Sequence, residues 1–249
     1  MILMYHHVAP PHAVPLSKGP NEGWEFTISP QGFEEQLATL RRRNYRFTSL
    51  AEKVDAIKKR GIEDSKSVAV TFDDGWVDNY QLALPVLKRL SIPATFFVTS
   101  AHLRKGSEDE KRMSEAQLKE LLTAGMSIGG HSRTHPVLTK LAPKQARDEI
   151  AGCREDLELA LGVSVRFFAY PGGAFNRDVA RLAKEAGYTA ACSVLGPARN
   201  DRSSLFWLYR DTLTERLRSL HDVYRLSPIL RGMLEFRVKG RLRRRLNGQ

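Results

Sequence analysis

The 249-residue chain has only two cysteines, Cys153 and Cys192. It also has no apolar run that reaches the roughly 18 residues of a membrane-spanning helix. Two cysteines do not make a disulfide framework. One falls in a helical pattern and the other in a predicted strand, so both are expected to be small buried hydrophobic residues. The first residues lack a basic segment followed by a longer apolar core, which argues against a secretory signal and favours a cytoplasmic protein.

Several catalytic signatures are missing as well. The sequence contains no Gly-rich phosphate loop of the Walker type, and no serine sits in a Gly-x-Ser-x-Gly elbow. It contains no recognised nucleic-acid motif, so no nucleic-acid partner is expected. Internal repeats and low-complexity linkers are also absent, which favours a single domain.

Positive charge is plentiful but unevenly spread. The formal net charge is +11, and the segment 225–249 alone holds eight basic residues against one acidic residue, Glu235. We therefore expect a domain at 1–225 followed by a basic amphipathic tail at 226–249. Such a tail suits an anionic membrane surface, which predicts peripheral contact with the inner membrane face. Packing of its apolar side on the domain is the alternative.

The segment 68–75 reads Val-Ala-Val-Thr-Phe-Asp-Asp-Gly. An apolar run rich in β-branched residues predicts a buried strand that delivers Asp73 and Asp74 to the C-terminal edge of a sheet. Neighbouring residues on an extended backbone point in opposite directions, so one carboxylate can hold a cation while the other handles protons. A simple turn that ends a strand is the alternative reading.

Predicted strands alternate with helices along the chain, which favours right-handed βαβ units and a parallel sheet. Residues 103–112 are expected to be a charged surface loop. The predicted strands cover 2–8, 68–72, 94–98, 126–129, 163–170 and 189–194, and the clearest helices cover 50–59, 78–90, 115–124 and 143–161.

Polar residues follow four of the predicted strands. Because the C-terminal ends of parallel strands share one face, we expect these residues to form one site. They are Asp73 with Asp74, His131 with His135, the segment 170–173 and Arg210 with Asp211.

The histidine pair carries the chemistry of this site. A His-x-x-x-His spacing is weak evidence alone, but two imidazoles and one carboxylate are the ligand set of an open catalytic site for Zn²⁺ or a similar ion. Water bound to such an ion can lose a proton near neutral pH, and a second carboxylate then serves as the general base that accepts it. The pattern favours metal-assisted hydrolysis.

With these motifs the chain resembles the polysaccharide deacetylases with a NodB-homology domain, the carbohydrate esterases of the fourth family. The resemblance extends to residue 215 and rests on Thr-Phe-Asp-Asp-Gly at 71–75, His-Ser-Arg-Thr-His at 131–135 and Phe-Ala-Tyr-Pro-Gly-Gly at 168–173. It implies an α/β fold, a distorted (β/α)7 barrel of the TIM type. It also implies removal of N-acetyl groups from hexosamine units.

The resemblance further implies residue roles. Asp74, His131 and His135 would hold the metal, with Zn²⁺ expected and Co²⁺, Ni²⁺ or Mn²⁺ as alternatives. Asp73 would be the base, and the backbone N–H of Gly172 would stabilise the oxyanion.

The chain departs from the family pattern at two positions. Many members have an arginine where this chain has Ala169, and that arginine positions the catalytic aspartate. We expect Arg210 to replace it, with a surface ion pair as the alternative.

The late Leu-x-His that provides the family's general acid is also missing, and His221 lies out of pattern. In the similar poly-N-acetylglucosamine deacetylase branch, the histidine that ends the first strand is thought to supply this acid. That position is His6 here. A buried structural histidine is the alternative for His6, and His7 is expected to be structural.

Tyr170, Gly172 and Trp207 are the predicted substrate-binding residues. Aromatic rings suit the apolar faces of sugars, although core packing is an alternative for Trp207 and for Trp24. The predicted activity is N-deacetylation of a polysaccharide or a lipid-linked sugar. A deformylase or deacylase of a lipid-linked amino sugar and a catalytically weak carbohydrate-binding barrel are the alternatives.

Overall fold

The computed structural model describes residues 1–10, 26–103, 110–194 and 199–214. Trp24, His221 and the basic segment 226–249 lie outside these ranges, so the expected domain boundary and tail stay predictions. In the described part of the chain, no helix is long and apolar enough to cross a bilayer.

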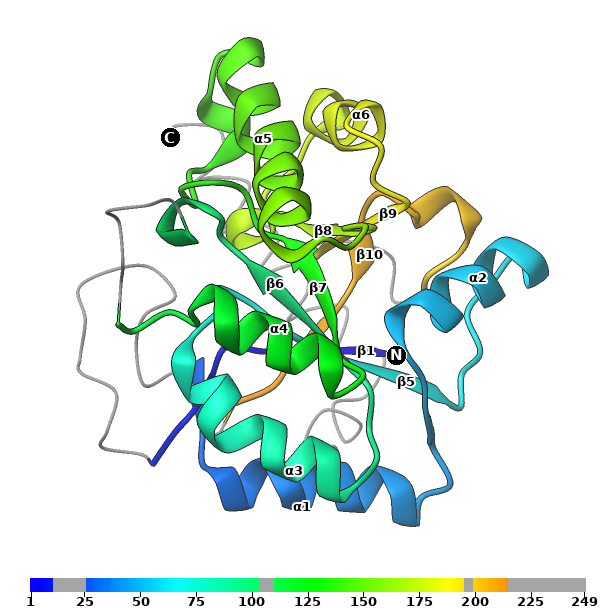
Figure 1. The fold of residues 1–249 in the computed structure, drawn as a ribbon. Coiled ribbons are helices and arrows are strands. Elements are labelled where there is room, and N and C mark those ends of the chain that lie inside the picture. Colours follow the sequence, from blue (N-terminus) through cyan, green and yellow to red (C-terminus); the bar gives the residue numbers. More distant parts are fainter. Residues whose placement is uncertain (11–25, 104–109, 195–198, 215–249) are drawn as a thin grey trace.

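Parallel strands alternate with helices through the described residues, as the hydrophobic pattern predicted (Figure 1). The main strands are β1 (Ile2–Tyr5), β5 (Ser67–Phe72), β6 (Ala94–Val98), β7 (Ser127–Gly130), β8 (Phe167–Ala169), β9 (Ala190–Ser193), β10 (Leu208–Tyr209) and β11 (Asp211–Thr212). The short strands are β2 (His7–Val8), β3 (Thr27–Ile28) and β4 (Arg46–Phe47). The helices are α1 (Pro30–Arg42), α2 (Leu50–Arg60), α3 (Leu84–Arg89), α4 (Glu115–Thr123), α5 (Pro143–Leu161) and α6 (Arg177–Glu185).

The sheet closes into a barrel through its last two strands. Its hydrogen-bonded order is β10-β9-β8-β7-β6-β5-β1-β11, so β10 and β11 lie at opposite ends of the order although only Arg210 separates them in the chain. The Arg210 N–H donates to the Ser193 carbonyl of β9, while β11 pairs with β1. Counted as one strand broken at Arg210, they complete the expected (β/α)7 barrel in the described ranges.

Two apolar cores follow from the period-2 alternation of the strands. On β5, Val68, Val70 and Phe72 face the outer core beneath α1 and α3–α6, whereas Ala69 faces the barrel interior. The interior cluster includes apolar side chains of α2, which seals the barrel at the amino ends of its strands. The opposite, carboxyl ends are therefore the end where a site can form.

Local capping signals account for the helix boundaries. Ser49 and Glu52 form a capping box at the start of α2, which ends at Gly61 in the left-handed conformation. Helix α5 spans the predicted residues and ends in the same way at Gly162. Both cysteines are buried, as expected.

Three predicted elements were wrong in detail. The strand predicted at 163–170 begins only at Phe167, and the helix predicted at 78–90 is a π-helical turn (Asn79–Ala83) continued by α3. The strand predicted at 2–8 breaks at His6, because β1 pairs with β5 and β11 whereas β2 leaves the barrel to pair with β3. The break at His6 reflects strand pairing with distant residues, which the hydrophobic periodicity does not encode.

Candidate active site

Asp73 and Asp74 leave the end of β5 in different directions. Asp73 continues the ladder, since its N–H donates to the Tyr5 carbonyl at 3.0 Å, and its side chain has the same parity as the inward-facing Ala69 and Thr71. Asp74 has a φ of 74°, which breaks the alternation and turns its carboxylate toward other partners. Both side chains are buried, so the two adjacent acids meet separate sets of residues.

Asp73 pairs with Arg210 inside the barrel. The two terminal nitrogens of Arg210 donate to the two carboxylate oxygens of Asp73, each at 2.6 Å, and one also donates to the Thr71 hydroxyl at 3.2 Å. Arg210 is 1% exposed and lies over the Phe97 ring, so this is not a surface ion pair. Burial, the largest single influence, raises the pKa of Asp73. The charge and hydrogen bonds of Arg210, together with the nearby His131 and His6, outweigh it and hold the pKa below its ordinary value. The carboxylate is therefore ionised and able to accept a proton.

Asp74 faces the two histidines of the motif at 131–135. Its Oδ1 lies 3.3 Å from Nε2 of His131 and 3.3 Å from Nε2 of His135. His131 follows β7, and its N–H donates to the Val98 carbonyl at 2.9 Å, which extends the ladder. The three ligand atoms all lie within 4.8 Å of one another. The structure thus brings the predicted metal ligands together.

The hydrogen bonding of this trio fits a cation. Nδ1 of His131 lies 2.8 Å from the Ala169 carbonyl, which can only accept, so Nδ1 carries a proton and Nε2 is the ring nitrogen left to bind a metal. Asp74 Oδ1 and His135 Nε2 are buried without a hydrogen-bond partner. Zn²⁺ ligands at about 2.0–2.1 Å in tetrahedral geometry lie about 3.3–3.4 Å apart, which matches both Asp74–imidazole distances. A buried carboxylate and two imidazoles gathered this closely form a ligand set that suits a divalent cation.

Trp76 and Arg112 brace Asp74 from outside. The indole N–H of Trp76 donates to Asp74 Oδ2 at 3.2 Å. The Arg112 guanidinium lies 3.5 Å from the centre of the Trp76 ring and also donates to the Asp74 carbonyl. Arg112 belongs to the segment expected to be a charged surface loop, and it is half-buried there by its contact with Trp76.

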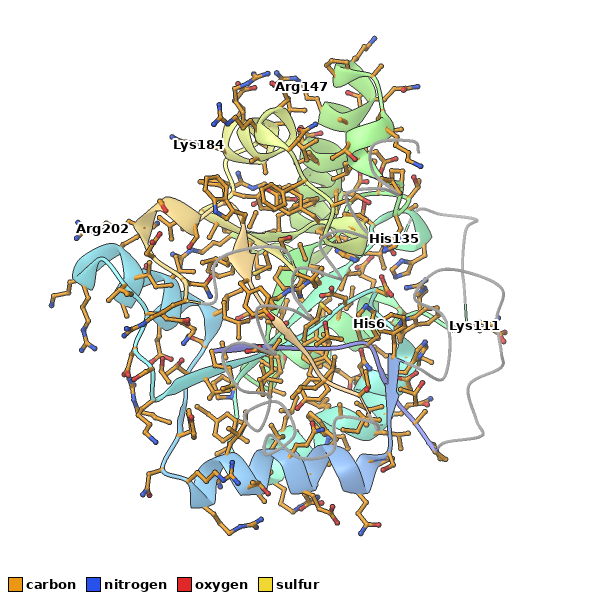
Figure 2. All side chains as sticks on the ribbon, turned by 180° about the vertical axis from the view of Figure 1, so that it is seen from behind. His6, Lys111, His135, Arg147, Lys184 and Arg202 are labelled. Atoms are coloured by element: carbon orange, nitrogen blue, oxygen red, sulfur yellow. The ribbon has the colours of Figure 1, made fainter. Side chains whose placement is uncertain are left out.

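His6 lies at the break between β1 and β2, beside the acids. It is 5% exposed, and its Nδ1 has no hydrogen-bond partner. Asn79, at the start of the π-helical turn, donates to the His6 carbonyl at 2.7 Å. Burial lowers the pKa of His6 despite the opposing charges of Asp74 and Asp73, so the ring is neutral at neutral pH. Figure 2 shows His6 and His135 toward the same end of the barrel, away from Arg202.

His7 is held differently. Its Nδ1 lies 2.6 Å from Asp78 Oδ2, and its ring lies against that of Trp76, tilted by 33° with 4.3 Å between centroids. These contacts anchor the chain where β1 ends, which agrees with the structural role expected for His7.

The predicted substrate-binding residues occupy different environments. Gly172 is exposed with a φ of 61°, and nothing lies within 4 Å of where a Cβ would be, so its backbone is accessible. Trp207 is half-buried and stacks parallel to Phe175. Tyr170 is fully buried, and its hydroxyl donates to the Phe206 carbonyl at 2.8 Å. The side chain of Tyr170 therefore supports this aromatic stack and does not present a surface to substrate, contrary to the expectation.

The residues that support the site were not predicted from the sequence. Asp78 and Asn79 begin three residues after Gly75 of the acid motif, and two polar residues at the start of a predicted helix were a usable signal. Arg112 gave none, because its contact with Trp76 spans distant parts of the chain.

Comparison with known proteins agrees with this geometry. A family model described as polysaccharide deacetylase matches residues 60–191. The peptidoglycan-N-acetylmuramic acid deacetylase PdaA of Bacillus subtilis is 33% identical over 144 residues, which are 57% of this chain and 51% of PdaA. The poly-beta-1,6-N-acetyl-D-glucosamine N-deacetylase of Staphylococcus aureus (strain MSSA476) is 25% identical over 201 residues, which are 76% of this chain and 69% of that protein.

A solved structure extends the likeness over nearly the whole fold. The deacetylase PplD of Streptococcus pyogenes, determined in complex with acetate, superposes with a TM-score of 0.77 at 25% identity, covering 91% of this chain and 97% of that chain. The family model covers more than half of the sequence, including both acids and both histidines of the site. The chain therefore belongs to the polysaccharide deacetylase family.

Proposed function

We propose that this protein removes N-acetyl groups from hexosamine units of a saccharide, with a divalent cation held by Asp74, His131 and His135. The observation that carries the proposal is the convergence of these three buried ligands beside a separate, buried Asp73–Arg210 pair. When bound, the cation would lower the pKa of water and polarise the amide carbonyl.

Different residues of the chain would activate the water and stabilise the negative charge that forms on the carbonyl oxygen. Asp73 is ionised and would take a proton from the attacking water, while Arg210 keeps its carboxylate in a fixed orientation. The accessible backbone N–H of Gly172 would donate to the oxygen that becomes negatively charged as the carbonyl carbon is attacked.

The leaving amine must gain a proton as the C–N bond breaks. His6 would deliver it, and because the resting ring is neutral, it has to become protonated within the reaction cycle. The proton that Asp73 removes from water is a sufficient source, so the products are acetate and a free amine. Direct return of that proton from Asp73 to the amine is the competing route.

Two relatives inform the substrate class. PdaA is described as acting on peptidoglycan N-acetylmuramic acid, and the Staphylococcus aureus protein on poly-beta-1,6-N-acetyl-D-glucosamine. We propose an N-acetylated saccharide for this chain too, with Trp207 on its stack with Phe175 as a sugar platform. Zn²⁺ is the proposed ion, because its preferred ligands and spacing fit the site.

Acetate release from defined substrates tests the proposal. The panel comprises β-1,4- and β-1,6-linked N-acetylglucosamine oligomers, peptidoglycan fragments, a lipid-linked N-acetylhexosamine and its N-formyl analogue. We expect turnover on at least one N-acetylated saccharide, loss of turnover after chelation, and recovery with Zn²⁺. Bound metal without turnover on any of them would favour a carbohydrate-binding barrel, and turnover of the N-formyl compound alone would favour a deformylase.

A further inference from the structure

The two histidine ligands are held by different parts of the fold. His131 directly follows β7 and is fixed by the strand ladder and by the Ala169 carbonyl. His135 comes four residues later, beyond the sheet. Ser132 and His135 both have left-handed backbone conformations, with φ values of 62° and 63°. Such conformations in residues other than glycine persist only where surrounding contacts impose them.

Helix α5 supplies one set of these contacts through Glu149. The Thr134 N–H donates to Glu149 Oε2 at 2.9 Å, and the Thr134 hydroxyl donates to Glu149 Oε1 at 2.7 Å. The Arg133 N–H donates to the Glu149 carbonyl at 3.2 Å. One residue of α5 thus receives three hydrogen bonds from the two residues that precede His135.

The second set forms around Arg133. Its guanidinium makes a two-pronged ion pair with Asp156, at 2.8 and 2.9 Å, and Asp156 also accepts from the Ser100 hydroxyl at 2.8 Å. The guanidinium lies directly on Gly152, where an added Cβ would be 2.1 Å from Arg133 Cζ. The contact between the motif loop and α5 therefore depends on the absence of a side chain at Gly152.

We infer that α5 positions the metal ligand His135 through Glu149, Gly152 and Asp156, none of which is itself a ligand. The inference rests on the proposed metal dependence and deepens it. The three residues are spaced three and four positions apart in the sequence, so they lie on one face of α5, and the loop 131–135 packs against that face. Their effect is to hold the His135 imidazole toward Asp74, so they set metal affinity and take no part in substrate binding.

The sharpest variant is Gly152→Ala. Alanine is favoured over glycine within a helix, so this change leaves α5 at least as stable. The three heavy atoms nearest to the added Cβ all belong to the Arg133 guanidinium, so the end of that side chain has to move to make room. A loss of metal affinity in a protein whose metal-free melting temperature is unchanged or raised cannot then be attributed to unfolding.

Glu149→Ala and Glu149→Gln form a complementary pair. Alanine removes both side-chain acceptors, whereas glutamine accepts from the Thr134 N–H and donates to the Thr134 hydroxyl, so it keeps both bonds without the charge. Arg147→Ala is the matched control, because Arg147 makes the exposed ion pair of α5 with Glu185 on α6 and lies far from His135 in Figure 2.

The experiment measures the Zn²⁺ dissociation constant of each metal-free full-length protein by competition with a chromophoric chelator, together with its melting temperature. We expect G152A and E149A to bind Zn²⁺ about tenfold or more weakly than wild type, the lower end of what residues that orient metal ligands contribute. E149Q and R147A should bind like wild type. Lost turnover in G152A should recover in excess Zn²⁺ with KM for the saccharide unchanged.

Wild-type affinity in both G152A and E149A, or a KM change that excess Zn²⁺ does not correct, would overturn the inference. If E149A does not fold, G152A decides alone. A wild-type protein that binds no divalent ion would overturn the proposed metal dependence and the inference with it, whereas tight binding by all variants would overturn the inference alone.

Discussion

Replacing Arg210 with methionine removes the only charge that pairs directly with Asp73 among the described residues. Methionine suits the apolar part of the pocket, where Arg210 lies over Phe97, but leaves the buried Asp73 carboxylate without its partner. Breaking a buried ion pair from one side costs about 3–5 kcal/mol of folding stability. The exposed pair of Arg89 with Glu34 is the control, since R89M should cost about 1 kcal/mol or less.

The contribution of Asp73 to folding stability should also change with pH in the opposite direction in R210M. In the wild type the pKa of Asp73 lies below its ordinary value of 3.8, so the pair contributes stability above that pH and loses it as pH falls. Without Arg210, burial is the main remaining influence and raises the pKa of Asp73. A carboxyl with a raised pKa contributes stability at low pH and loses it as pH rises. The stability difference between the two proteins should therefore widen from acid toward neutral pH.

Urea unfolding of the metal-free proteins at a series of pH values measures this difference directly. The double variant D73N/R210M should recover part of the loss, because it no longer buries a charge. A difference near that of the R89M control, or one that does not change with pH, would refute the reasoning about this pair.

Three further expectations concern the general acid, the metal ligands and the basic tail. His6→Asn should lower kcat on an N-acetylated sugar about 10²–10⁴-fold but affect an aryl acetate ester far less, because a phenolate leaves without a proton; equal losses on both substrates would remove the acid role. His135→Ala should abolish retention of Zn²⁺ by elemental analysis and reduce acetate release to background, with circular dichroism unchanged, and a variant that keeps its metal would contradict the ligand assignment. The full chain should float with anionic liposomes more than a 1–225 truncation, and equal flotation would dismiss the membrane contact predicted for segment 226–249.

The sequence was most informative where a signal is local. Helix α5 was predicted at its observed bounds because its capping residues and apolar face lie within one segment. The alternation of strands and helices predicted a parallel sheet and the set of residues that meet at its carboxyl edge, whereas the barrel was implied by the family resemblance. Parallel strands share one carboxyl edge, so their relative placement follows from topology alone.

What the sequence did not predict depends on contacts between distant segments. The strand breaks at His6 because β2 pairs with β3, and no feature of the sequence at 2–8 predicts this break. Asp74 has a left-handed backbone, which is uncommon for any residue other than glycine, and the strand pattern at 68–72 predicted an extended one instead. In the sequence, Arg112 is one of many charged residues in its segment, and only the structure shows that its guanidinium lies over the Trp76 ring.

An anomalous difference map at the zinc edge, from crystals of the Zn²⁺-loaded protein, tests the proposed metal site most directly. We predict a peak within about 2.0–2.2 Å of Asp74 Oδ1, His131 Nε2 and His135 Nε2. A map with no peak between these atoms, or with the ion bound elsewhere, would contradict the proposed metal-dependent deacetylation.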